Sequence, residues 1–139
     1  QSIAEQTGAE VKPAAIWDAF RKEYLEQNGR YELLDAEYTL PEPGTVYLRA
    51  HLRVDGREQT LSAEGNGPIE ALVHILHDAG AEPFELVSFR EHSLGSGADA
   101  RAAAYVALRR GETERFGAGL DSNTTLASLR AVVSAANRL

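Results

Sequence analysis

The hydrophobic pattern of this chain changes its period, and the order of the changes is repeated. Between Tyr31 and Ala63 apolar and polar residues largely alternate, which is typical of half-buried strands. The segment Pro41–Gly44 and the pair Asp55-Gly56 mark the turns between three such strands. From residue 68 to 79 the apolar residues follow a helical spacing, and Gly80 ends the helix. The first half therefore predicts three antiparallel strands followed by one helix.

The second half repeats this order. Strands are predicted at 84–94, 100–110 and 113–118, followed by a helix that Ser122 caps and that runs to the C-terminus. With Asn66 aligned on Asn123, the apolar positions of the two helices coincide: Ile69 with Leu126, Leu72 with Leu129, Ile75 with Val132 and Leu76 with Val133. We therefore predict an α+β fold of two repeated βββα units, which pack together because each sheet is too thin to bury its helix alone.

A different segment precedes the repeats. Residues 1–12 are polar and aperiodic, which indicates a linker remnant, and residues 13–28 form a predicted connector helix. The repeated part of the chain is expected at 29–139, with units at 29–80 and 81–139. The apolar face of the connector helix packs either on its own domain or on another domain or subunit. Because the chain starts at Gln1 and contains no methionine, we expect a fragment of a longer protein.

Composition excludes several functions. The net charge of −7 argues against a nucleic-acid or anionic-membrane partner, since both require a basic patch. The chain contains no cysteine, so disulfides and zinc–thiolate sites are excluded. No apolar run approaches the length of a membrane span, about 18 residues. We expect a cytoplasmic domain.

The loop from Gly65 to Pro68 is the clearest candidate for binding a ligand. It lacks the third glycine of a dinucleotide fingerprint and the Lys-Ser/Thr of a phosphate loop. Glycines allow backbone N–H groups to face a ligand, and the helix that follows adds partial positive charge. A small anion such as a carboxylate fits this arrangement. A tight strand-to-helix turn without any ligand is the alternative.

Other candidates are weaker. His74 and His77 lie three residues apart on a helix with Asp78 beside them, but no further metal ligand occurs at a recognisable spacing. Glu91-His92 offers an acid–base pair or a structural histidine. The small side chains of the alanine-rich strand at 100–107 leave room for a ligand or for close sheet packing. We expect no catalytic residue, no metal site and no cofactor.

These segments together resemble the C-terminal regulatory domain of 2-isopropylmalate synthase, a leucine-feedback module also found in citramalate synthases. The resemblance covers nearly the whole chain from about residue 13 and includes the following segments: Ile16-Trp17, Phe20–Leu25, Gly65–Ile69, Glu91-His92, Ala100–Val106 and Asn123 with Ala127–Arg138.

The resemblance implies a domain that binds the end-product amino acid, forms a homodimer and inhibits an N-terminal catalytic barrel of the same chain. In this family the barrel condenses acetyl-CoA with 2-oxoisovalerate, an acyl transfer that begins leucine synthesis. The fragment itself is then not an enzyme, and its ligand is L-leucine. Two alternatives remain: an isoleucine-sensing domain of a citramalate synthase, and a purely structural dimerisation domain.

The resemblance also implies a ligand site. Its residues, carried over by position, are Gly65, Asn66, Gly67, Ile69, Leu86, Phe89, Ser93, Ala100, Ala102 and Thr124. We expect the glycine loop to supply polar contacts, and Ile69, Leu86 and Phe89 to contact the ligand side chain. Thr124 and Thr125 stand where family members commonly carry aliphatic residues, so the second copy of the loop is more polar and the site is expected to be asymmetric.

Overall fold

The computed structural model describes residues 29–95 and 100–139. The first unit comprises β1 (Tyr31–Glu42), β2 (Thr45–Val54), β3 (Arg57–Gly65) and α3 (Pro68–Asp78). The second comprises β4 (Glu85–Leu94), β5 (Arg101–Arg110), β6 (Thr113–Asp121) and α4 (Thr124–Arg138). The predicted linker at 1–12 and connector helix at 13–28 lie outside the described residues.

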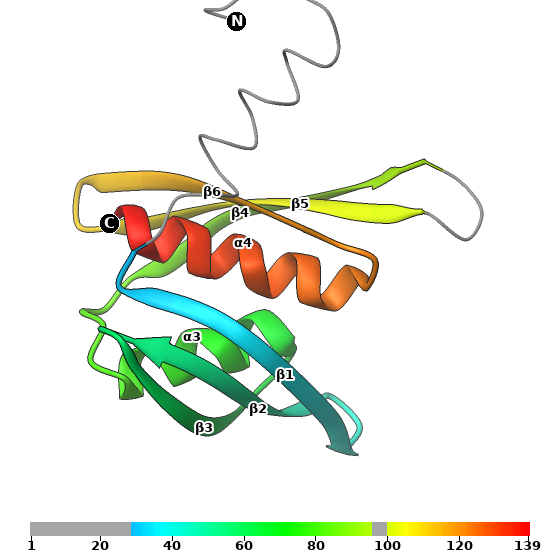
Figure 1. Cartoon of the computed structure of the whole chain (residues 1–139), viewed down its shortest axis with the longest axis horizontal. Helices are drawn as coiled ribbons and strands as arrows, with labels where there is room; N and C mark the ends of the chain where they lie inside the picture. The colour runs from blue at the N-terminus through cyan, green and yellow to red at the C-terminus, as the bar shows by residue number, and fades with distance from the viewer. Residues whose placement is uncertain (1–28, 96–99) are drawn as a thin grey trace, which may run out of the picture.

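The two units have the same topology. Each is a three-stranded antiparallel sheet, in the order β1-β2-β3 or β4-β5-β6, and each sheet is followed by one helix. α4 contacts β5 and β6 of its own unit and also β1 and α3 of the other, so it lies between the two sheets (Figure 1). The predicted α+β fold of two repeated βββα units is confirmed.

The core forms where the helices meet the inner faces of the sheets. The pairs aligned from the sequence occupy equivalent positions, because Leu72 and Ile75 of α3 and Leu129 and Val132 of α4 are all fully buried. Alternate residues of the central strand β2 are buried against them, as the period of two predicted. No helix of the described residues is long and apolar enough to cross a membrane.

The cap of α4 corrects one prediction. Asn123, and not Ser122, is the N-cap residue, and its side-chain oxygen accepts a hydrogen bond of 3.0 Å from the backbone N–H of Leu126. A side chain can cap only from the position directly before the first helical residue, and the helix begins at Thr124, one residue later than Ser122 requires. Asp121 also accepts a hydrogen bond from the backbone N–H of Asn123, which closes this turn.

Glycines allow each helix to lie unusually close to the last strand of its sheet. A Cβ atom at Gly119 would overlap the carbonyl oxygen of Ala127, and one at Gly117 would overlap the backbone N–H of Ala135. In the first unit a Cβ atom at Gly65 would lie 2.6 Å from the backbone nitrogen of Ala71. These contacts involve backbone atoms, which cannot move away as a side chain can, so the positions of both helices depend on the absence of a side chain.

His77 ties the end of α3 to the junction between the units. Its Nε2 accepts a hydrogen bond of 3.4 Å from the backbone N–H of Phe84, and the two rings meet edge to face with centroids 4.9 Å apart. Phe84 is buried in the common core. Burial lowers the pKa of His77, and the neighbouring His74 lowers it further, while Asp78 acts in the opposite direction.

The glycine contact predicts a large effect of Gly119→Ala. We expect the substitution to lower the free energy of unfolding by about 1–3 kcal/mol, since the helix backbone must move to admit a methyl group. Gly67→Ala is the matched control, because a Cβ atom there meets nothing within 4 Å, and its cost is expected to be below about 1 kcal/mol. Urea unfolding of both variants measures the difference, and equal costs would contradict the proposed role of close packing.

The lowered pKa of His77 predicts that acid destabilises the fold through this residue. Between its native pKa and its ordinary value of 6.5, the unfolded chain binds more protons than the native one, so stability falls as the pH decreases through this interval. In His77→Gln this part of the pH dependence is expected to disappear. Urea unfolding between pH 7 and pH 5 provides the comparison, and identical slopes for wild type and His77→Gln would refute the assignment.

Candidate functional site

The second sheet presents apolar residues on the inner face of its edge strand β4. Leu86 pairs with Leu108 and Phe89 with Val106 of β5, so both lie on the face that carries the core residues of β5. Simple alternation would place residues 86 and 89 on opposite faces. They share a face because a β-bulge interrupts the register between Leu86 and Ser88.

This part of the inner face is left open. α4 lies over β5 and β6, close to the glycines of β6, and does not extend over β4. Leu86 and Phe89 are each 41% exposed, and all ten residues of β4 are exposed. α4 therefore leaves an apolar strip uncovered beside it.

Small residues and a hydroxyl border the strip at the far end of β4. Ser93 pairs with Ala102 of β5, which in turn pairs with Asp121 at the end of β6. Thr124 begins α4 directly after the turn that follows Asp121. Ala100 precedes β5 and is half-buried. The predicted residues of the second unit therefore follow the inner face of β4 and then cross the end of the sheet to the beginning of α4.

The predicted residues of the first unit, Gly65 to Ile69, lie at the beginning of α3. Gly65 allows α3 to pack on β3, which is a structural role. The backbone N–H of Asn66 donates to the Glu70 carboxylate, while Gly67 is the N-cap residue, has an extended backbone and supplies no side-chain cap. Ile69 is half-buried against the core. The N-terminus of α3 therefore has no side-chain cap from its N-cap residue, and the Glu70 carboxylate lies at the same end.

The predicted residues of the first unit and those of the second unit lie in different parts of the molecule. α3 packs against β2, β3 and α4, whereas the strip of β4 belongs to the second sheet. Figure 1 shows that α3 and α4 both begin on the same side of the molecule, the right of the view. α4 stands between the groups, so the first loop and β4 form the borders of one region and not of one preformed cavity.

The other candidate residues do not assemble into a reactive group. Glu91 pairs with Ala104 on the inner face, and His92 pairs with Ala103 on the outer face, where its ring contacts Tyr105. The two side chains of the dipeptide therefore point apart, which excludes an acid–base pair between them.

The helical histidines also have separate partners. Nδ1 of His74 lies 2.7 Å from the carbonyl oxygen of Glu64, while His77 bonds to Phe84. Within residues 29–95 and 100–139, no group of three metal-ligating side chains occurs.

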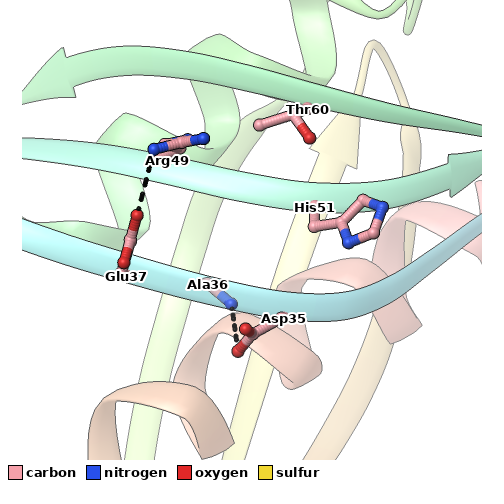
Figure 2. A pocket seen from close by; sticks show the side chains of 6 residues that line it. All are labelled: Asp35, Ala36, Glu37, Arg49, His51 and Thr60. Carbon is pink, nitrogen blue, oxygen red and sulfur yellow. Dashed lines mark hydrogen bonds and ion pairs between the residues drawn. The ribbon is translucent and has the colours of Figure 1, made fainter.

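A polar hollow of about 190 Å³ lies elsewhere, on the outer face of the first sheet (Figure 2). Its lining consists of Asp35, Ala36, Glu37, Arg49, His51 and Thr60. The charged groups are already paired: Arg49 with Glu37 at 3.3 Å, His51 with Glu58 at 3.1 Å, and Asp35 with the backbone N–H of Ala36. This hollow is a solvated, internally satisfied surface that contains none of the predicted site residues.

Three side chains that shape the region were missed from the sequence. Glu70 holds the first loop, and its signal is the acidic residue in the first turn of α3. Arg130 and Asn137 of α4 bond to the backbone of β1. Their signal is only that polar residues interrupt a helix that is otherwise largely buried.

Comparison with known proteins agrees with this description. Residues 10–139 match the family model described as the LeuA allosteric (dimerisation) domain. Similar proteins include 2-isopropylmalate synthases of Parafrankia sp. (42% identical), Renibacterium salmoninarum (42%) and Mycobacterium ulcerans (40%). Each alignment covers 99% of this chain but only 25% of the relative, so the chain spans about a quarter of the length of these synthases. The resemblance found in the sequence is confirmed, and the chain belongs to the family of LeuA allosteric (dimerisation) domains, the C-terminal regulatory domain of 2-isopropylmalate synthases.

Proposed function

We propose that this domain binds L-leucine, forms a homodimer and mediates feedback inhibition of a 2-isopropylmalate synthase. The observation that supports the proposal best is the open apolar strip of β4, where Leu86 and Phe89 remain exposed on an inner face that α4 otherwise covers. Family membership supplies the class of regulation. The synthase reaction, an acyl transfer from acetyl-CoA to 2-oxoisovalerate, belongs to the rest of the enzyme, and this domain needs neither a catalytic residue nor a cofactor.

The chemistry of a zwitterionic amino acid fits the residues of the region. The carboxylate is placed at the N-terminus of α3, where Gly67 leaves the helix without a side-chain cap. The first loop and the β4 strip do not form one cavity in the single chain, so the proposal requires that they approach each other in the dimer, where the isobutyl group packs against Leu86, Phe89 and Ile69. Ser93 and the carboxylate of Glu91, which share the inner face of β4, accept hydrogen bonds from the ammonium group. Asn66, Ala100, Ala102 and Thr124 complete the lining.

A second copy of the chain is the proposed cover for β4. An edge strand exposed along its whole length, with apolar side chains on it, is a surface that folded proteins normally pair or bury. Covering it would also enclose the ligand side chain. Ligand and dimer then stabilise each other, because each buries apolar area that the other leaves exposed.

The anion site is tested by calorimetry of leucine with Gly67→Asp and Gly67→Asn. Both residues are good N-caps and a side chain has open space there, so both variants are expected to fold. Asp places a negative charge beside the ligand carboxylate and is expected to weaken leucine binding about tenfold or more. Asn lacks that charge, and its effect is expected to be much smaller. Equal affinities for the two variants would contradict the placement of the carboxylate.

The apolar strip is tested by Phe89→Ala, with Phe116→Ala as the matched control. Phe116 of β6 is 56% exposed and pairs with Ala107 on the outer face, away from the strip. Loss of the Phe89 ring is expected to weaken leucine binding about tenfold, which corresponds to roughly 1.5 kcal/mol of lost apolar burial. Phe116→Ala is expected to bind like wild type.

The same titrations separate the alternatives for the whole domain. Tighter binding of isoleucine than of leucine would favour an isoleucine-sensing domain over a leucine-sensing one. A dimer without any heat or thermal stabilisation from leucine, isoleucine or valine would leave a purely structural dimerisation domain and would refute the sensing function.

A further inference from the structure

The C-terminal end of α4 holds the beginning of β1 by its backbone. The side-chain amide of Asn137 accepts a hydrogen bond from the N–H of Tyr31 and donates one to the carbonyl oxygen of the same residue, both at 2.8 Å. This is the pair of bonds that a neighbouring strand would make. One side chain thus replaces a strand at the edge of the first sheet, 106 residues away in sequence.

Two further contacts extend this connection along α4. Arg130 bonds through Nε to the Asp121 carboxylate and through a terminal nitrogen to the carbonyl oxygen of Leu33, both at 3.2 Å. Near the N-terminus of the helix, the hydroxyl groups of Tyr38 and Thr125 lie 3.3 Å apart. β1 therefore runs antiparallel along α4, as Figure 1 shows, and we call the set of these contacts the β1–α4 seam.

The seam has one end at the candidate ligand site and the other at the point where the preceding chain joins the domain. Thr124 and Thr125 begin α4, and Asn137 lies in its last turn. A helix of this length spans about 22 Å and behaves as a rigid rod. At the far end the fit is tight, since a Cβ atom at Gly29 would lie 2.6 Å from Cβ of Asn137.

We propose that the β1–α4 seam relays ligand occupancy from the second loop to the beginning of β1, and that Asn137 is its positioning residue. The inference rests on the proposed function. Ligand contact at Thr124 displaces α4 as one body with β6, against which the glycines hold it. Arg130, which Asp121 also holds, transmits the displacement directly to Leu33, and Asn137 transmits it to Tyr31. The two bonds of Asn137 form or break together, because one planar amide makes both. The beginning of β1 is thereby held in one of two positions.

The test uses the full-length synthase that contains this chain, with the variants Asn137→Leu and Gly29→Ala. Leu has a similar volume but makes neither bond, and Ala at residue 29 displaces the Asn137 side chain from the opposite side of the same contact. Leucine affinity is expected to stay within about threefold of wild type in both variants. The leucine concentration for half inhibition is expected to rise about tenfold or more, with the uninhibited rate unchanged. Arg30→Ala is the control, since it removes the exposed pair with Asp55 and the cation–π contact with the Tyr31 ring but neither of the two bonds of Asn137.

Hydrogen exchange supplies a readout that does not depend on activity. Leucine is expected to change the protection of the amide of Tyr31 in wild type and in Arg30→Ala, and to leave it unchanged in Asn137→Leu. If leucine inhibits both variants at the concentrations that inhibit the wild type, the proposed relay is refuted, while the proposed function is not. Parallel loss of binding and inhibition in both variants would also overturn it, since Asn137 would then be purely structural. A wild-type enzyme that binds no leucine would instead refute the proposed function.

Discussion

The close approach of α4 to β6 is the contact on which the rest of the structure depends. Gly117 and Gly119 bring the helix backbone against the strand, which fixes α4 over β5 and β6. Two consequences follow from this one position. β4 loses its cover, so Leu86 and Phe89 stay accessible, and the opposite side of α4 becomes available to β1. Without the glycines the helix would stand farther from the sheet, and both the strip and the seam would change.

Duplication explains the architecture, and the differences between the copies explain the site. Gly65 lets α3 approach β3 much as the glycines of β6 let α4 approach its sheet. The N-termini of the two helices differ, because Asn123 caps α4 with its own side chain whereas Gly67 gives α3 no side-chain cap. A helix whose first N–H groups are already bonded has little affinity for an external carboxylate. The asymmetry expected from Thr124 and Thr125 therefore has a second basis in the caps.

The sequence predicted the repeated units well, because alternation, hairpin turns and helical spacing are local signals. It misplaced the cap at Ser122, since the choice between adjacent polar residues depends on where the helix begins. In the candidate site, the period of a regular strand would have placed Leu86 and Phe89 on opposite faces of the sheet. The resemblance assigned both residues to the ligand site, and the bulge between Leu86 and Ser88 is what places them on one face. Arg130 and Asn137 were not predicted, because their partners lie 97 and 106 residues away and leave no local pattern.

The polar character of the seam has a physical consequence that an apolar contact would lack. Apolar side chains in contact tolerate small sliding, because dispersion depends weakly on which atoms meet. A planar amide that bonds both backbone groups of one residue tolerates little sliding, since a shift of about 1 Å lengthens both bonds beyond hydrogen-bonding distance. The helices and sheets can therefore share an adaptable apolar core while Asn137 fixes the register between the units. A domain that binds a small ligand and responds to it needs both properties. The adaptable core admits the ligand, and the rigid hydrogen bonds of Asn137 transmit the displacement.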